Sequence, residues 1–596
     1  MALLIERGPH VATDTMELAK LWAKNTYFDS ADRAEIQKLI DDNDTKEIEE
    51  RFYKDLEFGT GGMRAILGMG SNRIHKYAVR KATQAMCDVV AESYPGQNNS
   101  FAICYDSRTF SFEFAKEVAS VVAGNGMTAY IYDRLNPVAL LSWSIRHHKC
   151  KAGVMITASH NPTDYNGFKA YWDDGAQLTP PYDKKVIEAY NGIKDFNVIK
   201  TANFDSEESA GKIVWVGKDV EDTYYSMLKK YVINPELCAE KGGDVKLVYT
   251  PIHGTGLHAA QRVFEEMGLK NNYIVEEQAQ PDSKFPTVDS PNPENPEALA
   301  MAVELMKKVG ADVAMGTDPD TDRLGVAFLE KGEVRYLNGN QLAVLMLNYV
   351  LTGYSEQGRL PSNPYVIKTI VTSELQTAIC KNFNVEILNT LTGFKWICGK
   401  IKELEKSNPE KNYVFSSEES FGYLPHKEVR DKDGVASLAL FSEMMLWYKN
   451  QDMNLVQALD KIYDQYGFFH EELLCMNYYG KEGGEKIQRI MDNFRATSDG
   501  EILGEKIASL TDVQTGKLQN FETNESTQLD LPTSNVLGFS FKSGNKLWIR
   551  PSGTEPKVKF YIMLKESQGT LAEKKARAYK KACEVIEYLK KESNRA

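Results

Sequence analysis

The sequence predicts a mixed α/β protein of three or four domains that ends in an α+β domain, and three observations carry this prediction. The chain has 596 residues, and single hydrophobic cores stop growing at about 250 to 300 residues. Three separate segments each combine a Val/Ile/Tyr-rich run, a stretch with helical apolar spacing and a second short apolar run. The C-terminal segment instead has closely spaced strand-like runs and one long amphipathic stretch.

The three repeated segments, at residues 101–132, 246–276 and 365–389, predict strand-helix-strand units. Each unit favours a right-handed crossover between strands of a largely parallel sheet. In the tail, VLGFSF, KLWIRP and KVKFYIML predict antiparallel strands, and residues 571–591 predict a helix. Boundaries near 205, 335 and 465 follow. The predicted domains are therefore 1–205, 206–335, 336–465 and 466–596.

Composition and charge narrow the class of protein. Hydrophobic residues make up 42% and charged residues 26% of the chain, as in ordinary globular proteins. We expect no membrane span, because no run approaches the roughly 18 continuous apolar residues that one needs. A net charge of -12 argues against general nucleic-acid binding. The short apolar stretch at the N-terminus and eight scattered cysteines without a C-x-x-C pattern, several in apolar runs such as FAICYD and ELLCMNYY, predict a cytoplasmic protein with reduced core cysteines.

The sharpest local motif is GTDPDTDRLGV at residues 316–326, where Asp318, Asp320 and Asp322 alternate between two strand-like runs. Three crowded carboxylates repel one another unless a cation neutralises them. An EF-hand is excluded, because the sixth position is Arg323 instead of Gly and the twelfth is Leu329 instead of Glu. Oxygen ligands beside an arginine favour a Mg²⁺ that works on a phosphoryl group. A solvated acidic turn is the alternative interpretation.

A second motif, RPSGTEPK at residues 550–557, predicts a phosphate-binding loop. Arginine offers a bidentate fork, hydroxyls add donors, and glycine lets backbone N–H groups turn toward an oxyanion. The pattern G-x-x-x-x-G-K-[ST] is absent from the chain, which favours a small phosphorylated substrate over a nucleotide. A structural turn is the alternative. The loop residues are Arg550, Ser552, Gly553, Thr554 and Lys557.

Weaker motifs complete the set. FSSEESFGY at 415–423, with TGFKW at 392–396 nearby, offers adjacent carboxylates to sugar hydroxyls, and a polar loop is the alternative. FGTGGMR at 58–64 lets the backbone approach a ligand and carries Arg64. In YDSR, Asp106 and Arg108 are as readily explained by a structural salt bridge. The Pro/Asp-rich stretch 280–298 predicts a long irregular loop, and such loops are often functional.

MITASHNP, at residues 155–162, ends an apolar strand on Ser159 and His160, with Pro162 preventing continuation. A polar turn is the ordinary interpretation. Serine hydroxyl is a poor nucleophile, and the G-x-S-x-G elbow of α/β-hydrolases is not found around this serine. Beside a Mg²⁺ site and a phosphate-binding loop, however, a phosphorylated serine would add an oxygen to the metal. The sequence then indicates a serine that carries phosphate.

Together these motifs resemble the α-D-phosphohexomutase superfamily, which contains phosphoglucomutase and phosphomannomutase. TASHNP, GTDPDTDR, SEESFG and RPSGTEPK match its phosphoserine, metal, sugar and phosphate loops in the same order. The resemblance implies a four-domain phosphohexomutase-like architecture, with three related mixed α/β domains and a C-terminal α+β domain around a central cleft. That architecture agrees with the three strand-helix-strand units.

The resemblance also implies a role for each matched residue. It makes Ser159 the phosphoserine and a metal ligand, with Asp318, Asp320 and Asp322 as the other Mg²⁺ ligands. Arg323 would contact the phosphoryl group, and Arg64, His160 and Lys169 would assist charge and proton movement. The sugar would be held by Glu418 and Ser420, with Thr392, Gly393 and Lys395 nearby. The phosphate that is not transferred would be held by Arg550, Ser552, Gly553, Thr554 and Lys557.

The activity implied is a Mg²⁺-dependent conversion of glucose 1-phosphate to glucose 6-phosphate, with glucose 1,6-bisphosphate as intermediate and activator. SEESFG is similar to the glucomutase form of the sugar loop. The long N-terminal extension and MITASHNPTDYNGFKAYWDDGAQ resemble the branch with phosphopentomutase and glucose 1,6-bisphosphate synthase. Phosphomannomutase and phosphopentomutase activities are therefore alternatives. A Mg²⁺-dependent sugar phosphatase is a more distant alternative.

Overall fold

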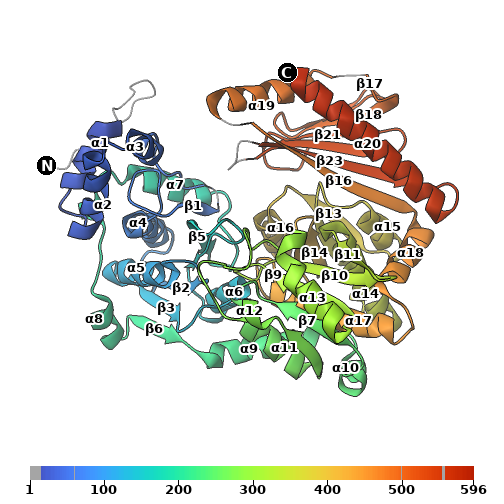
Figure 1. Ribbon diagram of the computed structural model, residues 1–596, viewed down its shortest axis with the longest axis horizontal. Helices are drawn as coiled ribbons and strands as arrows, with labels where there is room; N and C mark the ends of the chain where they lie inside the picture. The colour runs from blue at the N-terminus through green and yellow to red at the C-terminus, as the bar shows by residue number, and fades with distance from the viewer. Residues whose placement is uncertain (1–14, 60, 479, 498–499, 553–556, 596) are drawn as a thin grey trace. The chain divides into compact units, whose positions relative to one another are not determined.

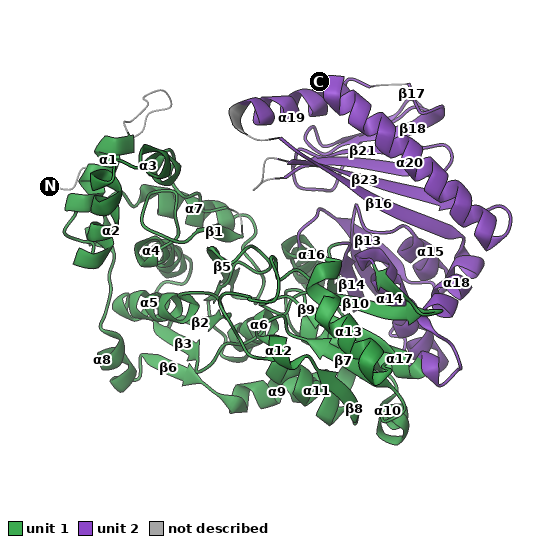
Figure 2. Cartoon of the chain, in the orientation of Figure 1, with its two compact units in different colours: residues 1–337, 394–409, 420–447 green, residues 338–393, 410–419, 448–596 purple. Residues whose placement is uncertain are grey.

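The structure is a computed structural model that describes residues 15–59, 61–478, 480–497, 500–552 and 557–595. Contacts divide the chain into two compact units (Figure 2). Unit 1 comprises residues 1–337, 394–409 and 420–447, and unit 2 comprises residues 338–393, 410–419 and 448–596. The boundaries of the four predicted domains stay a prediction.

The N-terminal extension folds as three helices, α1 (Thr15–Lys24), α2 (Ser30–Asp41) and α3 (Thr45–Phe52). Their apolar faces meet the rest of unit 1 in an aromatic cluster around Phe28, whose side chain is 2% exposed. The ring centroid of Phe28 lies 5.0 Å from that of Trp22 and 4.6 Å from that of Tyr77. The ring centroid of Phe196, which precedes the last strand of the first sheet in the chain, lies 5.3 Å from that of Phe28. The extension is thus part of the unit 1 core.

The first sheet of unit 1 has six strands in the order β1-β5-β4-β2-β3-β6. Strands β4, β2, β3 and β6 are parallel to one another. Strand β5 is antiparallel to β4, and the edge strand β1 is antiparallel to β5. The elements are, in chain order, β1 (Gly62–Ile66), α4 (Lys76–Ser93), β2 (Ser100–Tyr105), α5 (Ser111–Gly124), β3 (Thr128–Tyr132), α6 (Val138–His147), β4 (Ala152–Ile156), β5 (Tyr165–Trp172), α7 (Tyr182–Gly192), η1 (Phe196–Val198), α8 (Phe204–Ser209) and β6 (Ile213–Val216).

The second sheet of unit 1 has five strands in the order β11-β10-β9-β7-β8 (Figure 1). Strands β8, β7 and β9 are parallel to one another. Strand β10 is antiparallel to β9, and the edge strand β11 is antiparallel to β10. The elements are α9 (Lys218–Leu228), η2 (Lys229–Tyr231), α10 (Pro235–Lys241), β7 (Lys246–Thr250), α11 (Gly256–Glu266), β8 (Asn271–Ile274), α12 (Glu276–Ala279), η3 (Pro296–Leu299), α13 (Ala300–Val309), β9 (Val313–Thr317), β10 (Leu324–Glu330) and β11 (Glu333–Leu337). Unit 1 also contains α16 (Phe394–Ser407), β15 (Gly422–Leu424) and most of α17 (Gly434–Lys449).

Unit 2 repeats the parallel plan and adds the antiparallel domain. Strands β13, β12 and β14 are parallel, with β12 in the middle. The C-terminal sheet is antiparallel in the order β16-β23-β22-β21-β18-β19-β20, and its core includes residues of α19 and α20. The elements are α14 (Gly339–Glu356), β12 (Pro364–Thr369), α15 (Leu375–Asn382), β13 (Glu386–Thr390), β14 (Asn412–Glu418), α18 (Leu455–Tyr466), β16 (Phe468–Asn477), α19 (Gly480–Arg495), β17 (Glu501–Ile502), β18 (Glu505–Asp512), β19 (Lys517–Asn520), β20 (Ser526–Gln528), β21 (Leu537–Phe541), β22 (Lys546–Pro551), β23 (Lys557–Glu566) and α20 (Leu571–Arg595).

The three parallel cores share one connectivity. In each, the first strand of the strand-helix-strand unit pairs with the second strand on one side and with a later strand on the other. The pairs with the later strand are β2/β4, β7/β9 and β12/β14. Connections therefore lead to opposite sides of the first strand, which makes the carboxyl ends of these paired strands a topological switch point. Ligands of such sheets ordinarily bind beside the loops at that point. The predicted strand-helix-strand units and the mixed α/β class are confirmed.

The cysteines depart in part from the prediction. All eight are free, and six are buried as expected. Cys475, from the run ELLCMNYY that was predicted to be core, is exposed, and so is Cys583 of α20. Strand β16 lies at the edge of its sheet, and along its second half only alternate residues turn toward the core. None of the described helices combines the length and apolar character that a membrane crossing needs.

We expect Phe28→Ala to destabilise unit 1 by about 3 to 5 kcal/mol, because it empties a buried aromatic site. The matched control is Phe112→Ala, which truncates the same side chain where it is 40% exposed, and we expect it to cost under about 1 kcal/mol. Urea denaturation followed by far-UV circular dichroism measures both. Equal midpoints for the two variants would contradict the assignment of the N-terminal helices to the core.

Candidate active site

Ser159 lies three residues beyond the end of β4, in a loop at the switch point of the first sheet. Its side chain is 1% exposed, and its backbone has a φ of 52°, which is unusual for a residue with a side chain. The Ser159 amide donates to Thr157 Oγ1 at 2.7 Å, and that hydroxyl donates to Asp106 Oδ2 at 2.6 Å. Asp106 follows β2, so the two loops of the switch point are joined by this chain of hydrogen bonds.

The predicted acidic cluster forms in the loop between β9 and β10. Asp318, Asp320 and Asp322 are at most 1% exposed, and one carboxylate oxygen of each lies within 4.8 Å of the others. Ser159 Oγ donates to Asp318 Oδ2 at 2.7 Å, which brings the serine and acidic motifs together across 159 residues of sequence. The other oxygen of Asp318 accepts from two amides of its own loop, those of Asp322 and Arg323.

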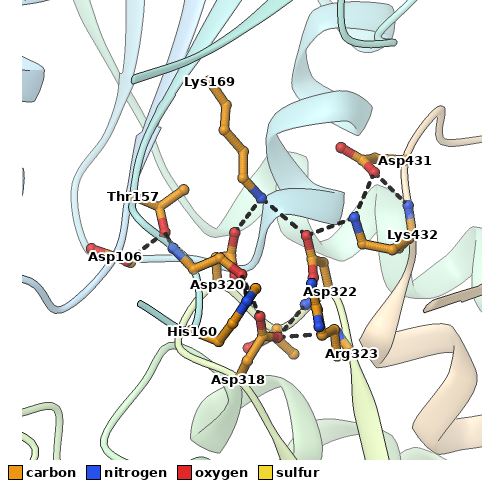
Figure 3. Close-up of polar contacts among 12 residues, drawn as sticks. Asp106, Thr157, His160, Lys169, Asp318, Asp320, Asp322, Arg323, Asp431 and Lys432 are labelled. Carbon is orange, nitrogen blue, oxygen red and sulfur yellow. Dashed lines mark hydrogen bonds and ion pairs between the residues drawn. The ribbon is translucent and has the colours of Figure 1, made fainter. Parts of the chain in front are cut away.

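Two lysine ammonium groups partly neutralise the carboxylates (Figure 3). Lys169 of β5 donates to Asp320 Oδ2 at 2.5 Å and to Asp322 Oδ2 at 3.0 Å. Lys432 Nζ lies 3.1 Å from Asp322 Oδ2 and 3.5 Å from Asp431. Three carboxylates therefore face two ammonium groups, and one negative charge is left over within this group of residues.

The pKa values reflect this balance. Burial, followed by the charges of Asp322 and Asp320, raises the pKa of Asp318 well above its usual value. Burial also opposes ionisation of Asp322, but Lys169, Lys432 and Arg323 outweigh it and lower the pKa of that carboxyl. Burial disfavours the charged form of Lys169, yet Asp320 and Asp322 raise its pKa. The site is built to hold carboxylates that need more positive charge than the two lysines supply.

A divalent cation fits this donor set. The Oδ1 atoms of Asp320 and Asp322 are buried and accept no hydrogen bond from the residues that the structure describes. Buried polar atoms are normally satisfied, so two such oxygens in one loop indicate an absent partner. An all-oxygen set of carboxylates with a nearby serine hydroxyl matches Mg²⁺ and related hard cations better than Zn²⁺.

The predicted basic and histidine residues surround the serine. His160 Nδ1 lies 3.1 Å from Ser159 Oγ, and burial together with Arg323 and Arg64 lowers the pKa of the imidazole well below its usual value. Arg64 of β1 is exposed and donates to the side chain of Asn161 at 3.3 Å. Arg323 forms an ion pair with Glu294. A neutral His160 is available to accept or pass a proton at Ser159.

In unit 2, the sugar-loop motif lies at the end of β14. Glu418 is 6% exposed, and its Oε1 accepts from the Gly393 amide at 2.6 Å, so two of the predicted stretches meet. Glu419 is half-buried and accepts from Thr369 Oγ1 at 3.2 Å. Burial raises the pKa of Glu419, although the charges of Lys559 and Arg550 oppose the shift. Thr392 precedes Gly393 in the same unit, whereas Lys395 in α16 and Ser420 belong to unit 1.

The phosphate-binding motif connects β22 to β23. Arg550 pairs in register with Lys559 of β23, and the Ser552 amide donates to the carbonyl of Lys557 at 2.8 Å. Gly553 and Thr554 lie outside the described residues. The described residues on either side of this connection belong to the ends of β22 and β23 and include Arg550, Lys557 and Lys559. Basic side chains gathered at the ends of two paired strands suit an anion.

Sequence reasoning did not single out Lys432 or Lys559. Lys559 could have been found, because it lies two residues after Lys557 in a strand and such residues share a face. Lys432 gave no comparable signal. It stands in the run DKDG just before α17, where charged residues ordinarily cap a helix. Only the fold shows that the loop containing Lys432 reaches the acidic cluster, since the Gly434 amide donates to the Thr321 carbonyl at 3.2 Å.

A buried serine beside a carboxylate cluster that fits a divalent cation, on this α/β scaffold, suits an enzyme of phosphoryl transfer. Comparison with known families identifies which class. Residues 55–196 match the family described as phosphoglucomutase/phosphomannomutase, alpha/beta/alpha domain I, and residues 222–331 and 338–466 match its domains II and III. The chain belongs to the phosphoglucomutase/phosphomannomutase family, within the α-D-phosphohexomutase superfamily, and is a phosphoglucomutase-type mutase.

Individual relatives agree with this membership. The chain is 34% identical to a phosphoglucomutase of Staphylococcus saprophyticus over 85% of this chain and 90% of that protein. A phosphoglucomutase of Staphylococcus epidermidis is 33% identical over 91% and 96% of the two chains. Among solved structures, a putative phosphomannomutase from Thermus thermophilus superposes with a TM-score of 0.65 at 18% identity, covering 91% of this chain and 99% of that one. Parafusin from Paramecium gives 0.65 at 17%, covering 90% and 96%. The two structures support the fold.

Removing one of the two ammonium groups should make the acidic cluster bind a divalent cation more tightly. We expect Lys432→Met to strengthen Mg²⁺ binding about tenfold, because a positive charge near Asp322 no longer repels the ion. Isothermal titration calorimetry on the full chain measures the affinity.

Lys427→Met is the matched control, since Lys427 lies in the same loop but pairs with Glu405 at 3.7 Å. We expect no change in its Mg²⁺ affinity. An unchanged affinity for Lys432→Met as well would show that Lys432 does not act on the charge of the cluster.

Proposed function

We propose that this enzyme is a Mg²⁺-dependent phosphoglucomutase that interconverts glucose 1-phosphate and glucose 6-phosphate through a phosphoserine at Ser159. The observation that carries the proposal is the hydrogen bond of 2.7 Å from Ser159 Oγ to Asp318 within the buried acidic cluster. A serine that only forms a turn does not require a metal-ligand carboxylate as its hydrogen-bond acceptor. The names of the staphylococcal relatives support glucose over other sugars.

In this proposal, Ser159 gives its phosphoryl group to a sugar phosphate and takes one back from glucose 1,6-bisphosphate. Asp318, Asp320 and Asp322 would hold the Mg²⁺ together with an oxygen at Ser159. When bound, the ion supplies positive charge to the phosphoryl oxygens, which carry most of the charge in a loose transition state. Lys169, which donates to Asp320 and Asp322, would add a second positive charge there.

The remaining residues would bind and orient the substrate. Arg64 and Arg323 would contact the phosphoryl group, and His160, close to Ser159 Oγ and favoured in its neutral form, would move the proton of the attacking hydroxyl. Glu418 and Ser420 would accept from sugar hydroxyls, beside Thr392, Gly393 and Lys395. The phosphate that stays on the sugar would be held by Arg550, Ser552, Gly553, Thr554 and Lys557.

A coupled assay of the purified enzyme with Mg²⁺ tests the substrate and the phosphoserine together. We expect conversion of glucose 1-phosphate to exceed that of mannose 1-phosphate and ribose 1-phosphate, and to depend on added bisphosphate. Ser159→Ala should lower kcat by at least about 10³-fold, because the carrier of the phosphoryl group is lost. Ser120→Ala, which truncates a buried serine of α5, is the control and should keep full activity.

Three outcomes would contradict the proposal. Faster turnover of ribose 1-phosphate or mannose 1-phosphate would assign a different sugar to the same mechanism. Release of inorganic phosphate without isomerisation would indicate a phosphatase. Full activity in Ser159→Ala would exclude Ser159 as the phosphate carrier. Intact-protein mass spectrometry would then find no phosphate that depends on this residue.

Removal of the metal gives a separate prediction. A chelator should abolish turnover, and added Mg²⁺ should restore it. We expect Asp320→Asn to weaken Mg²⁺ binding at least about tenfold, because a charged ligand becomes neutral. Asp312→Asn is the control, since Asp312 accepts from the Lys246 amide outside the cluster. Calorimetry that finds equal affinity in Asp320→Asn and Asp312→Asn would exclude Asp320 as a ligand.

A further inference from the structure

The backbone carbonyls of the serine loop are all engaged by hydrogen bonds, although the loop is neither helix nor strand. The carbonyl of Ala158 accepts from the Asn161 amide at 3.2 Å. The carbonyls of Ser159 and Pro162 accept from Arg108 at 2.6 and 2.7 Å, and that of Asn161 accepts from Arg108 as well. The His160 carbonyl accepts from Ser290 Oγ, so the five consecutive carbonyls 158 to 162 all have partners.

Arg108 supplies most of these bonds from a single guanidinium. Its Nη1 donates to Pro162 and to Tyr165 at 3.0 Å, and its Nη2 donates to Ser159 and Asn161. The side chain is 3% exposed and lies 3.6 Å from Asp106, which neutralises it. A structural salt bridge alone would need only the pair with Asp106. The four bonds to carbonyls of one loop show that the guanidinium is directed at the serine loop.

The His160 carbonyl, which lies between carbonyls that Arg108 reaches, is held by the irregular segment 280–298. Ser290 Oγ donates to the His160 carbonyl at 3.0 Å. The ring of Phe285, 1% exposed, lies under the Arg108 guanidinium with its centroid 5.1 Å away. The segment is itself anchored, since His253 beyond β7 bonds to Thr287 at 2.9 Å and to the Gln280 carbonyl at 3.2 Å.

We propose that Arg108 and the segment 280–298, acting through Phe285 and Ser290, are the positioning elements of the phosphoserine loop. Ser159 is held with a positive φ, a backbone state that persists only where the surroundings enforce it. The carbonyls from Ser159 to Pro162 are fixed on one side and the Ser159 amide is fixed by Thr157 on the other, so the Cα–Cβ bond of Ser159 is fixed in direction, and its hydroxyl donates to Asp318. The inference rests on the proposed role of Ser159 as phosphate carrier.

Positioning predicts an effect on the chemical step more than on substrate binding. We expect Arg108→Met to lower kcat about 10²-fold with KM changed less than about threefold, because a displaced reacting group loses its aligned geometry. Arg108→Lys should recover only part of the loss, since one ammonium cannot span four carbonyls in a fixed fork. Ser290→Ala should lower kcat about threefold to tenfold, as it frees one carbonyl.

Two controls match these variants. Arg73 is also buried and donates to a backbone carbonyl, that of Glu50, but it lies away from the serine loop. Ser71 Oγ donates to the Lys54 carbonyl at 2.7 Å, as Ser290 does to His160. We expect Arg73→Lys and Ser71→Ala to keep kcat within about twofold of the wild type, since neither bond reaches the loop.

Hydrogen exchange on the full chain gives a readout that does not depend on turnover. Peptides covering residues 157–165 should exchange faster in Arg108→Lys and Ser290→Ala than in the wild type, and unchanged in the two controls. Unchanged exchange and unchanged kcat in these folded variants would overturn the inference. If the wild type has neither phosphate on Ser159 nor mutase activity, the proposed function fails, whereas the exchange comparison still decides whether Arg108 and Ser290 order the loop.

Discussion

The burial of three carboxylates in one loop is the constraint on which the rest of unit 1 depends. Asp318, Asp320 and Asp322 are at most 1% exposed, and buried charges are costly unless they are paired. Lys169 comes to them from the first sheet and Lys432 from the loop before α17, so neutralisation alone draws three distant segments together. The two ammonium groups leave the cluster short of positive charge. That deficit makes the cluster a suitable site for a cation.

The sheets explain how such distant residues meet. Each parallel core places two loops side by side at its switch point, and in each core the two loops are bonded to one another. Thr157 after β4 donates to Asp106 after β2. Thr255 after β7 bonds to Thr321 after β9 at 2.8 Å, and Thr369 at the end of β12 donates to Glu419 after β14. Every motif loop that follows a parallel strand is therefore supported by the loop of its neighbour, which fixes its shape without fixing its chemistry.

The sequence predicts much of the fold and the main motifs, but it does not predict which distant segments come into contact with them. Apolar runs alternating with helical spacing predicted the three parallel cores, because period and strand length are local properties. The acidic motif was visible because three crowded carboxylates repel one another unless a cation neutralises them. The serine motif, which is ordinarily a polar turn, indicated a function only beside the acidic and phosphate-binding motifs. Lys432, Ser290 and the direction of Arg108 were not predictable. Their roles arise from segments that meet only after the sheets form, and a lysine before a helix or a serine in an irregular stretch has the same composition whether or not it touches a reacting loop.

The environment of Ser159 shows a division between the groups that balance charge and those that fix shape. Lys169 and Lys432 face the carboxylates, where a metal ion could replace their positive charge. Arg108 faces backbone carbonyls and is neutralised by its own aspartate, so its bonds need not change when a phosphoryl group arrives or leaves. If Ser159 is the phosphate carrier that we propose, it needs a support of this second kind. In that proposal, a loop held by Lys169 and Lys432 would lose its support whenever those lysines moved toward a phosphoryl group.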